Sequence, residues 1–522
     1  MQVEQLPDLL PLRDPSGQVV GLFSDHGSWL ALTWGEENLL DVHDTRDGTI
    51  SPIHLSSPAL GRVVFADRLE AELLDGTRVR VGFLSPNSIF VEHQASLTTP
   101  LPAVATEGGT LVGESLEEPP PRDLFDRNRA AWNRRFERAV EVCLRARTVR
   151  DLELLARAVT TLAWNWRAPV GALQHGGFVP SPFAYNGFWG WDSWKHAHAL
   201  AAIEPERAKE QLRAQFSRQR EDGMVPDTVR IDPALDNWKN TKPSLAAAAL
   251  EAIWRAERDD ALVVELFPRC AAQLDFFDRQ RRLEGEILLR PGGVDHETAT
   301  WDSGWDLSAR FAGVPLVEHG AWKLFDLQTA DLNAYHLMEL LALSRLAKVA
   351  GADPSHWADR TMRLFDEIRT LFDPLPGAFC DRYGYGASSG ILSAASWLPV
   401  VAGAATRRQA DLVTQMLMNP GLFNTPMPFP TLARTEPAFD PDGYWNGSVW
   451  LDHAALALAV LGDEGLEAEE RLFDHVAGPA TLFECYSPLT GRPAAGSRPA
   501  VPQFSWSAAA LIEILTPKEL TR

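Results

Sequence analysis

The residues with the clearest chemical potential lie in short stretches where carboxylates, tryptophans and glycines crowd together. In residues 185–195, aromatic side chains and two glycines surround Asp192. A core helix would space its apolar residues three and four positions apart, which this stretch does not do. Asp192 is therefore either the N-cap of the helix that follows or an acceptor for two hydroxyls of a sugar that stacks on Trp189 and Trp191.

A second stretch, residues 296–310, places two aspartates four residues apart beside two tryptophans. Cleavage of a glycosidic bond needs a carboxylic acid that is still protonated near neutral pH, and burial against aromatic surface disfavours the ionised form. Asp306 directly follows Trp305 and so has this local setting. Asp302 is an alternative acid, and either aspartate could instead cap a helix or pair with Arg310.

A third stretch, residues 442–450, repeats the pattern of glycine and tryptophan, and a fourth carries Glu484 between Phe483 and Cys485. A glutamate in such an apolar setting is more often paired, or placed at the rim of a pocket, than catalytic. Glycoside hydrolysis takes two carboxyl groups, however, and inverting enzymes hold them roughly 6.5 to 9.5 Å apart to leave room for water. Glu484 is therefore a candidate partner for an aspartate of the second stretch.

Composition narrows the class of protein. The 522 residues carry a formal net charge of -21, so the mean field repels nucleic acids and anionic lipid surfaces. Residues 1–12 lack the form of a signal peptide, and no window approaches the roughly 18 apolar residues of a membrane span, so we expect a cytoplasmic protein without a membrane partner. The four cysteines show no Cys-x-x-Cys spacing and no phosphate loop or dinucleotide fingerprint is present, so we expect no metal and no cofactor.

The chain around these stretches divides into a β-rich part and a helical part. A period of two, with an Asp75-Gly76 hairpin signal, predicts a small antiparallel β domain over residues 1–100. Residues 101–124 lose periodicity and collect Pro, Gly and Glu, which predicts a linker. Residues 125–522 are predicted to be helical. The expected helices cover residues 126–148, 151–166, 191–203, 205–220, 243–257, 261–281, 326–349, 357–371, 391–401, 407–418, 448–461, 466–476 and 505–515.

Seven short motifs, taken in order, resemble glycoside hydrolase family 63 and its relatives among the trehalases and glycogen-debranching glucosidases. The resemblance spans roughly residue 128 to the C-terminus. The motifs are GFWGWD at 187–192, DGMVP at 222–226, KP at 242–243, DSGWD at 302–306, YWNGSVW at 444–450, FECY at 483–486 and FSW at 504–506. One departure concerns Asp302, which stands where the acid loop of the family commonly has glutamate, and this leaves the choice of substrate open.

The resemblance implies a mainly α protein: an (α/α)6 toroid with alternating inner and outer helices, here preceded by the small, sandwich-like antiparallel β domain. It implies an inverting, exo-acting α-glycosidase, with Asp306 as general acid and Glu484 as general base. The residues expected to contact the sugar are Tyr185, Trp189, Trp191, Asp192, Trp305, Tyr444, Trp445 and Trp450.

The expected substrate is a small α-linked glycoside, such as a gluco-oligosaccharide, glucosylglycerate or mannosylglycerate, which reacts with water. Two alternatives remain at this point. One is a carbohydrate-binding protein that has lost catalysis, and the other is a sugar epimerase or isomerase on the same toroid. An epimerase would need a pair of histidines at the site, whereas His296 is the one histidine in the acid and base stretches.

Overall fold

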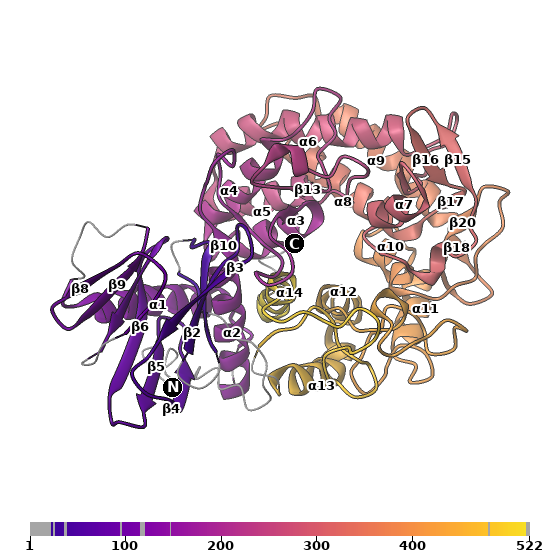
Figure 1. Ribbon diagram of the computed structural model, residues 1–522. Coiled ribbons are helices and arrows are strands. Elements are labelled where there is room, and N and C mark those ends of the chain that lie inside the picture. Colours follow the sequence, from indigo (N-terminus) through magenta and orange to yellow (C-terminus); the bar gives the residue numbers. More distant parts are fainter. Residues whose placement is uncertain are drawn as a thin grey trace.

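The computed structural model describes residues 22–24, 27–35, 39–93, 97–114, 121–146, 148–478 and 481–517. A β-rich part precedes a larger helical part, as the sequence predicts, and the two lie side by side with α1 and α2 next to the sheets (Figure 1). Residues 1–12, on which the expected absence of a signal peptide rests, lie outside the described residues. No helix in the described ranges combines the length and the apolar character needed to cross a bilayer.

Two antiparallel sheets make up the β-rich part, a three-stranded one of order β1-β2-β3 and a six-stranded one of order β4-β5-β6-β7-β9-β8. The predicted hairpin is present, because β5 and β6 pair across Asp75 and Gly76. Gly76 has a φ of 82°, a left-handed conformation that favours glycine. The strands are β1 (Leu30–Trp34), β2 (Leu39–Asp44), β3 (Thr49–His54), β4 (Ala59–Val64), β5 (Leu69–Leu73), β6 (Arg78–Ser85), β7 (Ser88–Glu92), β8 (Ala103–Thr106) and β9 (Gly109–Gly113).

The prediction of a linker over residues 101–124 is wrong for its first half. Strands β8 and β9 lie in that range, and β9 pairs with β7 inside the six-stranded sheet. They are four and five residues long, too short to show a clear period of two; β9 is fixed by pairing with residues 88–92, and β8 by pairing with β9. The sheet therefore extends to Gly113, and residues 115–120 lie outside the described part.

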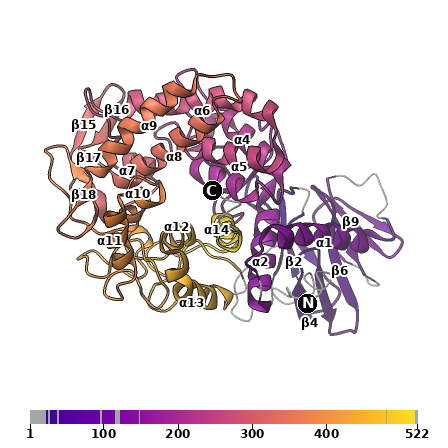
Figure 2. The same ribbon diagram turned by 180° about the vertical axis from the view of Figure 1, so that it is seen from behind.

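Fourteen α-helices are described. In chain order, twelve of them alternate between a peripheral and a central place in the fold (Figures 1 and 2). Six lie toward the middle of the helical part in Figures 1 and 2: α3 (Gly190–Leu200), α5 (Ala246–Glu257), α8 (Ala330–Leu346), α10 (Leu398–Val401), α12 (Leu451–Leu461) and α14 (Ser505–Leu515). Six lie around them: α2 (Val149–Asn165), α4 (Pro205–Phe216), α6 (Asp260–Gln280), α9 (Pro354–Arg369), α11 (Arg407–Leu417) and α13 (Leu466–Ala477). The remaining two are α1 (Leu124–Val142) and α7 (His296–Ser303).

The six central helices contact one another in a closed order. Helix α3 contacts α5, α5 contacts α8, α8 contacts α10, α10 contacts α12, α12 contacts α14, and α14 returns to α3. Each also contacts at least one peripheral helix, as α3 does with α4 and α8 with α9. This six-hairpin helical arrangement places the N-termini of α3, α12 and α14 near each other.

Most predicted helices are confirmed, but two local expectations are wrong. Residues 391–401 form a short 3-10 helix, Ala394–Trp397, followed by only four residues of α10, with Pro399 in its first turn. Conversely, residues 296–303 are absent from the expected helices but form the short helix α7. Asp295 and Thr298 cap its start reciprocally, and Gly304 ends it in the left-handed conformation.

Candidate active site

A cavity of about 490 Å³ lies where α3, α12 and α14 begin. Trp189, Trp450 and Phe504 occupy the N-cap positions of these helices, without a side-chain hydrogen bond to the first turn. Most helices place Ser, Thr, Asp or Asn there. Here the three positions carry aromatic side chains, and all three line the cavity.

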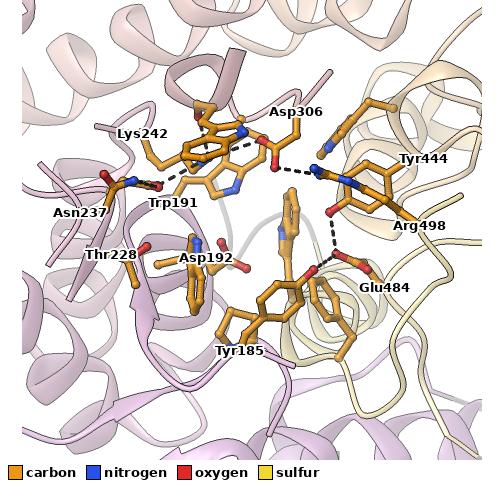
Figure 3. A pocket seen from close by; sticks show the side chains of 18 of the residues that line it. Tyr185, Trp191, Asp192, Thr228, Asn237, Lys242, Asp306, Tyr444, Glu484 and Arg498 are labelled. Atoms are coloured by element: carbon orange, nitrogen blue, oxygen red, sulfur yellow. Dashed lines mark hydrogen bonds and ion pairs between the residues drawn. The ribbon is translucent and has the colours of Figure 1, made fainter. Parts of the chain in front are cut away.

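The fold brings the expected site residues together from separate loops (Figure 3). Every residue expected at the site except Trp305 lines the cavity: Tyr185, Trp189, Trp191, Asp192, Asp306, Tyr444, Trp445, Trp450 and Glu484. Trp305 is fully buried behind the aromatic side chains that line the cavity. Its ring stacks on that of Trp445 with the ring centres 5.0 Å apart, and the Arg310 guanidinium lies 4.4 Å from the centre of the Trp305 ring. Contrary to the expectation from the sequence, Trp305 therefore does not face the sugar site but packs behind Trp445 and supports it.

Glu484 is the carboxyl group that has the protected setting expected of Asp306. Its side chain accepts hydrogen bonds from the Tyr185 hydroxyl at 3.0 Å and the Tyr444 hydroxyl at 2.9 Å. Burial raises the pKa of Glu484 to about 7, although both hydroxyl donors favour the ionised form. Glu484 therefore changes its charge near neutral pH.

Asp306 lies in a different environment from the aromatic burial that its position after Trp305 suggested. Its carboxylate faces two cations, with Lys242 Nζ 3.7 Å from Oδ1 and an Arg498 guanidinium nitrogen 3.6 Å from Oδ2. The side chain keeps 25% of its surface exposed. Asp306 therefore faces the cavity between two positively charged side chains.

Asp302 is fully buried and is absent from the residues that line the cavity. Its two oxygens accept from the Arg281 guanidinium, both at 2.9 Å, and from the backbone N–H groups of Thr241 and Gly292, both at 3.0 Å. Neither aspartate of this stretch pairs with Arg310, which instead binds Asp331 and Asp381. All hydrogen-bonding directions of Asp302 are thus occupied by the protein, which favours Asp306 as the reacting group.

Asp192 is not the N-cap of its helix, because that position belongs to Trp189. It lies in the first turn of α3 and lines the cavity. Burial raises the pKa of Asp192 to about 7, against the opposing charges of Lys195 and Lys242. A buried carboxylate at a cavity wall can accept hydrogen bonds from sugar hydroxyls. This is the second of the two roles that the sequence suggested for Asp192.

The aromatic wall is continuous. Trp445 stacks on Trp450 with ring centres 4.1 Å apart and planes 10° apart, and Trp191 lies 4.8 Å from Trp506. Flat rings of this kind offer large apolar faces with few rotatable bonds. Together with Asp192, this wall can hold a pyranose ring by stacking and hydrogen bonding.

Sequence reasoning about single residues missed a group of charged residues in the same cavity: Asp227, Arg230, Lys242 and Arg498. Burial raises the pKa of Asp227 to about 6, and Lys242 Nζ lies 3.5 Å from its Oδ1. Lys242 also donates to the Trp301 carbonyl at 2.5 Å. Lys242 belongs to one of the seven motifs and Asp227 directly follows another, so the motifs could have pointed to both.

The profile of one protein family, described as the mannosylglycerate hydrolase MGH1-like glycoside hydrolase domain, matches residues 185–507. This range is more than half of the chain and contains every residue that lines the cavity except Pro180. The chain belongs to this family. It is therefore a glycoside hydrolase.

Individual relatives agree with this membership. Mannosylglycerate hydrolase MGH1 of Selaginella moellendorffii is 28% identical over an alignment of 413 residues, and the match covers 64% of this chain and 81% of that protein. A structure of the GH63 mannosylglycerate hydrolase from Thermus thermophilus with glucose has a TM-score of 0.57 at 22% identity, and covers 69% of this chain and 99% of its own. Neutral trehalase Nth1 from Saccharomyces cerevisiae has a TM-score of 0.53 at 16% identity, over 67% and 75% of the two chains. The resemblance to glycoside hydrolase family 63 is thereby confirmed, and the structural neighbours share its six-hairpin fold.

Proposed function

We propose that this glycoside hydrolase is exo-acting and cleaves the α-linkage of a small glycoside with inversion, on an (α/α)6 toroid. The observation that carries the proposal is the pair of carboxyl groups, Asp306 and Glu484, that face one aromatic cavity from different loops (Figure 3). The closed order of six central helices supports the toroid. The cavity is large enough for a drug-sized ligand and too small for a long polysaccharide chain, which fits a small substrate.

The two carboxyl groups have separate tasks in this proposal. Asp306 donates a proton to the glycosidic oxygen, and Glu484 takes a proton from the water that attacks the opposite face of the sugar. The hydroxyls of Tyr185 and Tyr444 hold Glu484 in place by donating to its carboxylate. Asp192 and the aromatic wall bind the sugar ring that is released.

Charge around Asp306 favours an acidic aglycone. Arg498 lines the cavity beside Asp306, and its guanidinium can pair with a substrate carboxylate there. The names of the curated relatives, mannosylglycerate hydrolases, point to the same class, because glycerate carries a carboxylate. Mannosylglycerate and glucosylglycerate are therefore our first candidates, ahead of neutral gluco-oligosaccharides.

An epimerase or isomerase is less well supported. The cavity-lining residues in the described part of the chain include no histidine, whereas such an enzyme would need a pair. A binding protein without catalysis could also use carboxylates to hold sugar hydroxyls, but membership of a glycoside hydrolase family favours an enzyme. Hydrolysis is therefore the better account of the site.

The stereochemistry of the product tests the proposal directly. Proton NMR in the first minutes of hydrolysis of an α-glycosylglycerate or α-linked disaccharide is expected to show the β-anomer of the released sugar, because water attacks the face opposite to the leaving group. Mutarotation then brings in the α-anomer. Initial release of the α-anomer would contradict inversion, and no turnover across these substrates would contradict the proposed class.

The pH dependence of kcat/KM should follow Glu484. The base must be ionised, so kcat/KM is expected to rise as the pH rises through about 7, the pKa to which burial raises Glu484, and to fall about tenfold per pH unit well below it. Changing Tyr444 to Phe removes a donor that favours the ionised form, so this limb should move to higher pH. If kcat/KM instead rises at a pH below 5, or if the Tyr444 variant leaves the pH of this rise unchanged, Glu484 is not the base.

A further inference from the structure

A buried lysine lies behind the aromatic wall of the cavity, out of reach of a substrate. Lys195 Nζ is 3.7 Å from the ring centre of Trp191 and 3.8 Å from that of Trp506, and both rings line the active-site cavity. Lys195 itself lines a second cavity of about 730 Å³, which Trp506 shares. The two indoles therefore separate the lysine from the substrate site.

The charge of Lys195 is balanced by one acid. Its Nζ donates to Asp452 Oδ2 at 2.9 Å, and the other oxygen of Asp452 lies 2.9 Å from His453 Nδ1. The ion pair joins α3, which carries Lys195, to α12, which carries Asp452, and the contact of Lys195 with Trp506 adds α14. Buried ion pairs are often no more stabilising than apolar residues of similar volume. Stability alone therefore gives little reason for a lysine here.

The position of Lys195 relative to the site offers a reason. An ammonium group against two indoles is attracted to both ring faces, most strongly when it is desolvated, so it restricts their tilt. The same charge acts on Asp192, three residues earlier on α3. Burial raises the pKa of Asp192, Asp227 adds to this, and Lys195 and Lys242 oppose it.

We propose that Lys195 is a positioning residue for the sugar site: it fixes Trp191 and Trp506 as a rigid wall and, about one turn along α3, places a positive charge that favours Asp192 as an acceptor for sugar hydroxyls. The proposal rests on the proposed function for its sugar ligand. It goes beyond that function because it assigns a role to a residue that no substrate touches. The charged groups around Lys195 are Asp452, Asp192 and Glu513, with His453 on the far side of Asp452.

The test uses the double variant K195M/D452N, which removes both charges and so leaves no unpaired buried aspartate. The matched control is K209M. Lys209 is another buried lysine with two acidic partners, Glu206 at 2.8 Å and Asp259 at 3.0 Å, but it lies on the peripheral helix α4. Equal retention of the fold in both variants is checked by circular dichroism and by the Tm.

The first measurement needs no ligand. With 5-fluorotryptophan in the full chain, the fluorine resonances of Trp191 and Trp506 are identified by changing each to Phe. Both resonances are expected to shift and broaden in K195M/D452N and to stay unchanged in K209M. If they are the same in the double variant as in the wild type, Lys195 does not order the wall and that half of the proposal is wrong.

The second measurement is the pH dependence of KM for an α-glycosylglycerate. Without the lysine, Asp192 should ionise only at higher pH, so the pH at which KM begins to rise is expected to move up by about one unit, while kcat at high pH changes less. K209M should keep the wild-type profile. An increase in KM that is equal at every pH would mean that Lys195 only packs, and would overturn its role toward Asp192.

A binding control separates this proposal from the function on which it rests. The D306N enzyme is titrated calorimetrically with the same glycosides. Binding by D306N that weakens in D306N/K195M/D452N supports the proposal, and equal binding by both contradicts it. If D306N binds no glycoside, the proposed function and the role toward Asp192 both fail, whereas the ordering of the wall is still decided by the fluorine spectrum.

Discussion

Replacing Asp306 by Asn, or Glu484 by Gln, is expected to lower kcat by about 10²- to 10⁴-fold while the fold stays intact. Each change keeps the shape of the side chain and removes only the group that gives or takes a proton, and general acid or base catalysis contributes a factor of this size. The corresponding rise in the barrier is about 2.7 to 5.4 kcal/mol. Initial rates give kcat, and circular dichroism with the Tm checks the fold. The control is D222N, which removes a partly exposed carboxylate that pairs with Arg220.

The leaving group can assign the two roles. An aryl glycoside such as a nitrophenyl glycoside departs without much help from an acid, so the loss in the Asp306 variant should be far smaller on it than on a glycosylglycerate. The loss in the Glu484 variant should be similar on both substrates, because a base acts on water. This comparison is needed because Glu484 has the raised pKa while Asp306 faces two cations.

Two results would change the assignment. If the aryl substrate rescues the Glu484 variant and not the Asp306 variant, the acid and base are exchanged. If both variants keep activity within tenfold of the wild type, a loss of less than about 1.4 kcal/mol, neither residue is catalytic.

Replacing Asp302 by Asn is expected to lower the free energy of unfolding by about 3 to 5 kcal/mol, because it leaves the Arg281 guanidinium buried without its counter-ion. Urea unfolding measures this change. Turnover per folded molecule should fall far less than in D306N, since Asp302 supports the loop but does not line the cavity. D474N is the control, because Asp474 forms an exposed pair with Arg150 and should cost less than about 1 kcal/mol.

The opposite pattern would restore Asp302 as the acid. Unchanged stability in D302N, together with a loss of turnover as large as in D306N, would contradict the purely structural role. Stability and turnover are therefore measured on the same preparations.

Local sequence signals were sufficient for most helices. Residues 151–166 were predicted from their apolar spacing, and the helix found there, Val149–Asn165, starts with a reciprocal cap between Thr148 and Asp151. Strands β8 and β9 were missed because each is short and is held by pairing with a neighbour, which the spacing within a single strand does not reveal.

The seven motifs also predicted which loops meet, and all but one of the expected site residues line the cavity. Trp305 was the exception. Its neighbour in the chain, Asp306, faces the cavity, while Gly304 turns the backbone at a φ of 81° and Trp305 packs against Trp445 on the other side of the wall. Adjacency in the chain did not predict that the two side chains face different ways.

The sequence by itself determined the helical architecture, the loops that carry the chemistry and the presence of candidate carboxyl groups. The resemblance favoured Asp306 over Asp302 as the acid, and only the tertiary structure revealed that Asp302 is bound to a buried arginine while Asp306 lines the cavity. It also placed Lys242 and Arg498 beside Asp306 and two tyrosines on Glu484. The physical reason is that the proton affinity of a carboxyl group depends on the charges, donors and burial that surround it in space, and folding supplies these from segments far away in the chain.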